Sequence, residues 1–169
     1  MMFRTHILFA FFFYFLALKI FSFSWLFALL LALGAILPDI DSPSSFVNKK
    51  YMLGIGKSIS FFSVHRGFWH SIYGAAIFTF VSLVITFFAH ASIFYALALF
   101  SGYILHLAAD SLNVSGIKWF WKSGHLRWKI RTASLSEQIF FVALLVLTLY
   151  IAIGNEGFKK ISAFVLRKP

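Results

Sequence analysis

The chain has 169 residues, of which 61% are hydrophobic and 12% charged, and its formal net charge is +10. Soluble domains are usually about half apolar and a quarter charged, so this composition excludes an ordinary soluble domain and indicates a protein of the lipid bilayer. The lack of cysteine excludes disulfides, thiolate nucleophiles and cysteine zinc sites. The basic residues fall in loops and the tail, which favours attraction to anionic lipid headgroups over nucleic-acid binding.

Five apolar runs predict an all-α, multi-pass transmembrane helical bundle. They are Ile7–Phe21, Phe23–Leu37, Gly67–Ala89, Ala91–Ala109 and Gln138–Ile153. A full crossing needs about 20 apolar residues, so the third and fourth runs are predicted to span, whereas the other three are short. We expect one domain over residues 1–153 and a short basic tail over residues 154–169.

The first two runs meet near Lys19 with almost no loop between them. They could form a tight helical hairpin across a thinned bilayer, or one long, tilted or bent helix. A third interpretation makes Met1–Ser24 a signal peptide with Arg4 before its apolar core. The bulky residues that follow lack a small-x-small cleavage pattern, which argues against the third interpretation.

Acidic residues are scarce and stand at the ends of the apolar runs. The chain has only five of them, and Asp39, Asp41 and Asp110 each close a run. A carboxylate at the edge of hydrocarbon is costly unless it is compensated. Histidines gather at equivalent places, with His6 before the first run and His65 and His70 around the start of the third. A divalent metal would compensate several Asp and His side chains together.

Antiparallel threading of five helices places all these residues on one membrane face. The same face carries the two long loops, over residues 42–64 and 111–136, and ten of the fifteen basic residues. Because loops rich in Lys and Arg stay inside, we expect this active-site face to be cytoplasmic. The basic tail on the other face weakens that orientation.

Two pairs have the spacing of metal ligands. His106 and Asp110 are four apart and share one helix face, and Gly102 would let a neighbouring helix approach this stripe closely. Asp39 and Asp41 follow Pro38, and in an extended stretch residues two apart point the same way. The alternatives are a helix-end aspartate bonded to a structural histidine, and an ordinary helix exit through turn-forming residues.

The start of the third run adds His65, Arg66 and His70. On one helix the two histidines would diverge by about 140°, but Gly67 favours a non-helical start from which both can face one point. Arg66 is either a clamp for a phosphate or carboxylate or an interfacial arginine. Glu137 lies in Ser134-Leu135-Ser136-Glu137, a capping box that by itself explains a glutamate there.

These residues resemble the YdjM-like family of inner-membrane, metal-dependent hydrolases. The matching stretches cover nearly the whole chain in the expected order: Arg4–His6, Gly34–Asp41, His65–Gly67 with His70–Ser71, Gly102–Tyr103 with His106 and Asp110, and, more loosely, Arg131–Thr132 with Ser134 and Glu137. The resemblance implies a multi-pass helical protein whose His, Asp and Glu residues form the active site. Ala133, where the family usually has glycine, and Trp69 and Asn113 depart from its pattern. A more distant similarity connects the chain to the zinc-dependent phospholipase C and single-strand nuclease superfamily.

The expected activity is metal-assisted hydrolysis of a phosphoester in an amphiphilic, lipid-like substrate at the bacterial inner membrane. Zinc suits a His and carboxylate ligand set, here His6, Asp39, Asp41, His65, His70, His106 and Asp110. Asp39 or Glu137 would be the general base, and Arg66 would neutralise phosphate charge. The alternatives are a membrane scaffold that binds metal without catalysis and an ion or metal transporter. The oligomeric state is left open.

Overall fold

Five α-helices, a short 3₁₀ turn and a two-stranded hairpin make up the part of the chain that the structure describes. The structure is a computed structural model that describes residues 1–20, 22–41 and 67–154, with the backbone alone at residues 40 and 41. The elements in chain order are α1 (Phe3–Ala17), α2 (Trp25–Gly34), the 3₁₀ turn η1 (Leu37–Asp41), α5 (Ile72–Phe88), α6 (Ile93–Ser111), β1 (Ile117–Phe120), β2 (Ser123–Leu126) and α7 (Leu135–Gly154).

The break between the first two helices is built from two polar side chains. Ser24 caps α2 by accepting a hydrogen bond from the amide of Phe27. The hydroxyl of Tyr14 donates to the carbonyl oxygen of Ser24 and accepts from its amide. Of the two arrangements that the sequence left open, the structure shows two separate helices and not one long helix. α1 also packs against α6 and α7.

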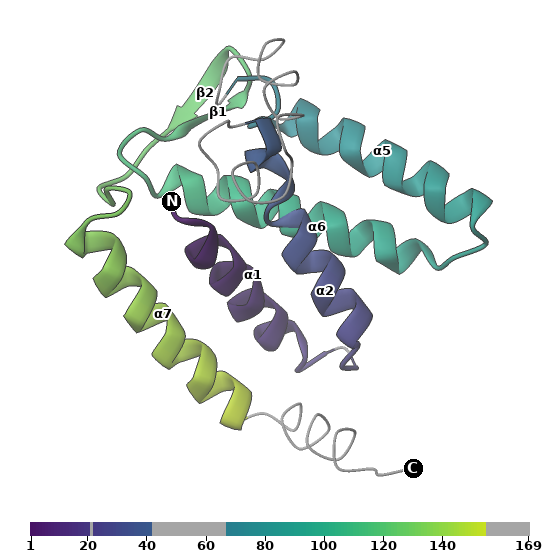
Figure 1. The fold of residues 1–169 in the computed structure, drawn as a ribbon, viewed down its shortest axis with the longest axis horizontal. Helices are drawn as coiled ribbons and strands as arrows, with labels where there is room; N and C mark the ends of the chain where they lie inside the picture. Colours follow the sequence, from purple (N-terminus) through teal and green to yellow (C-terminus); the bar gives the residue numbers. More distant parts are fainter. Residues whose placement is uncertain (21, 42–66, 155–169) are drawn as a thin grey trace.

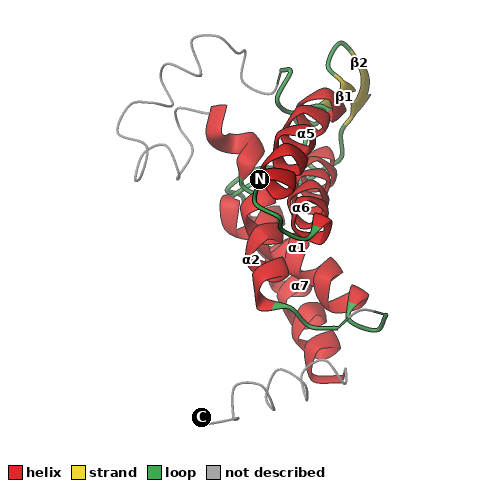
Figure 2. Ribbon diagram, turned by 90° about the vertical axis from the view of Figure 1, so that its right-hand side faces the viewer, coloured by secondary structure: helices red, strands yellow, loops and turns green. Residues whose placement is uncertain are grey.

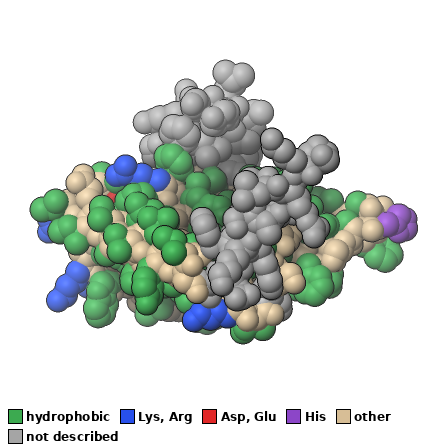
Figure 3. All heavy atoms as spheres, turned by 90° about the horizontal axis from the view of Figure 1, so that it is seen from below, with side chains coloured by type: hydrophobic (Ala, Val, Ile, Leu, Met, Phe, Trp, Pro, Cys, Tyr) green, Lys and Arg blue, Asp and Glu red, His purple; other side chains and the backbone are tan. Residues whose placement is uncertain are grey.

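α6 is the central element. It packs against α1, α2, α5 and β1, whereas α7 packs against α1. Figure 1 shows α5 and α6 running across the direction shared by α1, α2 and α7. The end of α6 that carries Asp110 lies beside the start of α1 and beneath the β1–β2 hairpin. Seen from below, hydrophobic side chains predominate on the described part of the surface (Figure 3).

Three sequence expectations need correction. The fold is not all-α, because residues 117–126 form an antiparallel hairpin within the expected loop. By length and apolar composition, α6 and α7 are the helices of the described ranges that can cross a membrane. α5 has only 17 residues, because Gly67–Ser71 forms turns ahead of it. α7, expected to be short, gains its length from the residues 135–137. The basic tail lies outside the described residues.

Candidate metal centre

The close crossing of α2 and α6 sets the position of the site. A β-carbon on Gly102 would collide with the backbone of Leu31, Gly34 and Ala35, and one on Gly34 would collide with the backbone of Leu99. Only glycine at both positions allows this approach. The prediction for Gly102 is confirmed, and the contact brings the carboxyl end of α2 against His106, one turn further along α6.

His106 is held by a backbone carbonyl that sequence reasoning did not identify. Its Nδ1 lies 2.8 Å from the carbonyl oxygen of Ala35, which is left without a helical partner at the end of α2. A carbonyl can only accept, so Nδ1 carries the proton. The other ring nitrogen, Nε2, is buried and has no hydrogen-bond partner among the described residues. It faces Asp39 Oδ1 and Asp110 Oδ2, each 3.9 Å away.

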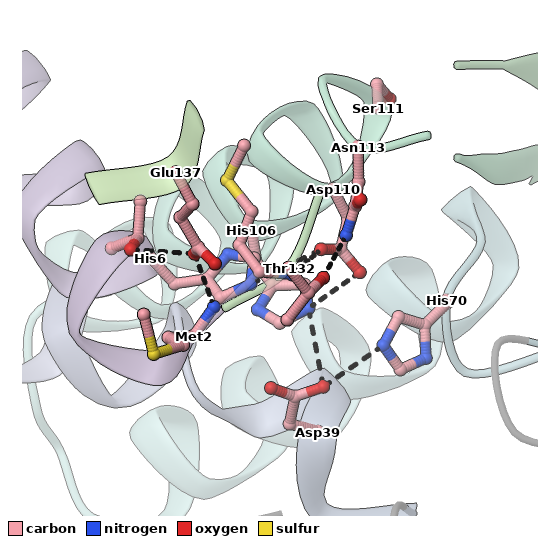
Figure 4. Close-up of polar contacts among 12 residues, drawn as sticks. Met2, His6, Asp39, His70, His106, Asp110, Ser111, Asn113, Thr132 and Glu137 are labelled. Atoms are coloured by element: carbon pink, nitrogen blue, oxygen red, sulfur yellow. Dashed lines mark hydrogen bonds and ion pairs between the residues drawn. The ribbon is translucent and has the colours of Figure 1, made fainter. Parts of the chain in front are cut away.

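Two further histidines complete the cluster (Figure 4). Nε2 of His6, in the first turn of α1, lies 3.4 Å from Asp110 Oδ1, and Nε2 of His70 lies 3.4 Å from Asp39 Oδ1. The His6 ring stacks on the His106 ring, with centroids 3.9 Å apart. All three imidazoles are at most 1% exposed. Asp110 Oδ1 also contacts the amino group of Met1 at 2.7 Å.

The geometry of the cluster fits a bound divalent cation. Two overlapping triads, His6–Asp39–His106 and His70–His106–Asp110, have one ligand atom per residue within 4.8 Å of one another. Zinc–nitrogen and zinc–oxygen bonds of about 2.1 Å place tetrahedral ligands about 3.4 Å apart, close to the observed 3.4 and 3.9 Å. An unprotonated Nε2 and a carboxylate repel each other, and a cation between them removes that repulsion. The carbonyl bond to Nδ1 is the usual support for a ligating histidine.

Asp39 lies at the partly exposed edge of the cluster. Its side chain is 21% exposed, whereas that of Asp110 is 2% exposed. Burial acts to raise the pKa of Asp39, but the contact with His70 and the nearby His106 and His6 outweigh it, so the pKa is held below its ordinary value. Asp39 therefore presents an ionised carboxylate at the opening.

A hydroxyl on α6 positions the turn that carries His70. Tyr103, 1% exposed, donates to the carbonyl oxygen of Trp69. Gly74 permits this contact, since a β-carbon there would meet the Tyr103 hydroxyl and the Trp69 backbone. His70 lies in this turn, since α5 begins only at Ile72, after Ser71 as its N-cap.

Glu137 lies beside the cluster as a clasp between α1 and α7. Its Oε1 accepts from the Met2 amide at 2.6 Å and the Thr5 hydroxyl at 2.9 Å, and its Oε2 accepts from the Ala133 amide at 2.7 Å. The expected capping box is therefore not formed. Glu137 accepts from the amide of Ala133 and not from that of Ser134, and the Ser134 hydroxyl donates to the carbonyl oxygen of Arg131. Ala133 adopts a φ of 59°, the left-handed conformation that glycine adopts at no steric cost.

Five of the predicted ligands come together: His6, Asp39, His70, His106 and Asp110. Asp41 ends the η1 turn, and its side chain is not described. His65 and Arg66 lie outside the described residues. His90, at the far end of α5, and His125, on β2, belong to neither triad. Thr5 and Tyr103 were not identified as functional, although both stand in stretches that carry the family resemblance.

Comparison with known proteins agrees with that resemblance. Residues 1–166 match the family described as YdjM inner membrane protein. The chain belongs to the YdjM family. It is 34% identical over 114 residues to the inner membrane protein YdjM of Escherichia coli (strain K12) and, equally, to that of Shigella flexneri. Each alignment covers 63% of this chain and 53% of the relative, so the chain spans about half the length of these curated YdjM proteins. No solved structure matches it significantly. By this relationship the protein belongs to the inner membrane.

Proposed function

We propose that this YdjM-family chain is a membrane-bound, metal-dependent hydrolase that acts on a phosphoester of a lipid-like substrate. The observation that carries the proposal is His106, whose proton is fixed on Nδ1 by Ala35 while its buried Nε2 faces two carboxylates. This arrangement supports the binding of a cation at Nε2. His6, His70, Asp39 and Asp110 supply the remaining ligand atoms, and Asp41 and His65 remain predicted ligands from the sequence.

A divalent ion, for which this ligand set favours zinc, would supply Lewis-acid charge and lower the pKa of bound water to about 7. Asp39, at the opening, is proposed as the general base that would accept a proton from a reacting water. His70 contacts Asp39 and holds its position. Arg66 is proposed to neutralise phosphate charge, on sequence grounds. Glu137 is satisfied by three donors, so its contribution is to fix α1, and with it His6.

An amphiphilic substrate is supported by an apolar cavity of about 720 Å³ along α1, α2 and α6. The cavity does not contain the metal ligands. Its lining includes Leu31 and Leu105, which stand one turn before Ala35 and one residue before His106. Its size and apolar walls suit an alkyl chain. A substrate with its phosphate at the cluster would then have hydrocarbon within reach of this cavity. The site face is proposed to be cytoplasmic because the basic loops lie on it.

Metal analysis of the purified protein tests the proposal, with His106→Asn as the decisive variant. Asparagine can still donate to the Ala35 carbonyl but offers no atom at the position of Nε2. We expect roughly one or more divalent ions per chain in the native protein and severalfold less in the variant. His90→Asn is the matched control, because His90 lies outside the cluster and asparagine tolerates its positive φ. Equal metal contents in all three proteins would contradict the proposal.

A scaffold that binds metal without catalysis is the second candidate, favoured by the burial of the three imidazoles. Release of phosphate or of the lipid alcohol from a panel of lipid phosphoesters separates the two. The hydrolase requires turnover by the metal-loaded protein that His106→Asn abolishes and His90→Asn retains. Metal binding without turnover across the panel would favour the scaffold.

A further inference from the structure

The β1–β2 hairpin is anchored on α6 by one face, and most side chains of its other face are exposed. Ile117, 2% exposed, packs with Tyr103 and Leu107 of α6. The indole nitrogen of Trp119 donates to the Ser111 hydroxyl at 2.9 Å. Backbone hydrogen bonds from Val114, Trp128 and Ile130 tie the base of the hairpin together. The hairpin is therefore held rigidly over the end of α6 that carries Asp110, and it projects there beyond the helices (Figure 2).

Aromatic and basic side chains share the free part of this hairpin and of the segment that follows it. The large exposed apolar side chains are Phe120, Trp121, Leu126 and Trp128. The exposed basic side chains are Lys118, Lys122, Arg127 and Lys129. Trp121 turns the chain in the left-handed conformation, with φ 58°, and the Lys122 ammonium lies 5.0 Å from the centre of its ring. The exposed tip of the hairpin therefore carries a positive charge directly beside an aromatic ring.

These cations have no anionic partner inside the described protein. Residues 111–136 contain five Lys or Arg residues and no Asp or Glu. Among described side chains the carboxylates are those of Asp39, Asp110 and Glu137, and all three are engaged in the cluster or the clasp. No ion pair joins the four hairpin cations to a described residue. The charge complement of this surface therefore does not lie among the described side chains.

We propose that the hairpin is a docking arm for the headgroups of anionic phospholipids at the membrane surface beside the candidate metal centre. The hairpin stands at the end of α6, a helix long and apolar enough to span the membrane. Trp side chains favour the membrane–water interface, and nearby Lys and Arg attract anionic headgroups. Exposed Phe and Leu beside the cations suit a lipid interface better than a nucleic acid, which offers no apolar layer. The inference does not depend on hydrolysis or on bound metal.

Lipid retention by the full-length protein tests the arm. The protein, stripped of metal with a chelator, is equilibrated in dodecyl maltoside with equal amounts of phosphatidylglycerol and phosphatidylcholine of the same acyl chains. Lipids that stay bound are counted by native mass spectrometry. Since each basic residue near the surface contributes about fivefold in affinity, we expect roughly tenfold or greater preference for phosphatidylglycerol. The preference should shrink as salt is raised.

The combined variant K118Q/K122Q/R127Q/K129Q should lose most of this preference. The matched control removes the same charge from the tail, as K159Q/K160Q/R167Q/K168Q, and should keep it. Lys122→Gln alone, expected to lose severalfold, replaces the combined variant if that one does not fold by circular dichroism. Equal retention of both lipids by the native protein would overturn the proposal. An equal loss in the tail control, or full displacement of the lipid by inorganic phosphate, would overturn it as well.

Discussion

At the scale of single residues, Glu137 was expected to cap the start of α7, but its side chain joins the start of α7 to the start of α1. Its carboxylate accepts from the amide of Met2 and the hydroxyl of Thr5 on one side and from the amide of Ala133 on the other. The carboxylate is fully buried, and so is the Thr5 hydroxyl that donates to it. This clasp fixes the first turn of α1, in which His6 lies.

Glu137→Gln should lower the free energy of unfolding by about 1–3 kcal/mol, because one oxygen becomes an NH₂ group that cannot accept from Ala133. Chemical unfolding in detergent measures the change, and Gln138→Ala, at an exposed neighbouring position, serves as the control. The metal content should stay close to native. Complete loss of metal with unchanged stability would instead identify Glu137 as a ligand.

At the scale of elements, the crossing of α2 and α6 decides whether the cluster exists. Gly34 and Gly102 let two backbones touch, and the contact directs the last free carbonyl of α2 to His106. The same contact brings η1, and with it Asp39, over α6. The small residue in the Gly102–His106–Asp110 stripe predicted a close helix approach, but it did not identify which helix would approach.

Gly102→Ala should force the two helices apart, since the added β-carbon meets the backbone of Leu31 and Ala35. Overpacking of this kind costs about 1–3 kcal/mol, and it should also weaken metal retention by moving Ala35 away from His106. Unfolding and metal content are measured together. Gly154→Ala is the control, because nothing lies within 4 Å of a β-carbon there. Normal metal binding by Gly102→Ala would refute the link between this crossing and the site.

At the scale of the whole molecule, the candidate centre joins four segments distant in sequence: α1, η1, the turn before α5, and α6. Helices of 10 to 17 residues such as α1, α2 and α5 gain much of their stability from packing and not from helix propensity. A metal bound to all four segments would therefore stabilise the entire described fold.

Chelation should lower the thermal midpoint, and added zinc should restore it. At about a hundredfold excess of metal over its dissociation constant the stabilisation is about 2.7 kcal/mol. Thermal scans with and without chelator measure the difference. Equal thermal midpoints in the two scans would argue against a bound metal.

The sequence by itself determined the membrane character of the chain, the five helices and the end of each helix at which the ligands lie. These properties depend on local composition and on the alternation of helix direction, both of which can be read from the order of residues. The hairpin at residues 117–126 was missed because each strand has only four residues and β2 is exposed throughout, so that no alternation marks it as a strand.

Only the tertiary structure decided which atoms meet. The Ala35 carbonyl that fixes the proton on His106 carries no side-chain signal, and its role depends on the α2–α6 crossing. The pairing of Glu137 with Thr5 joins residues 132 positions apart, which no local pattern predicts. Local preferences determine the elements, whereas the contacts between them depend on how closely the backbones can approach.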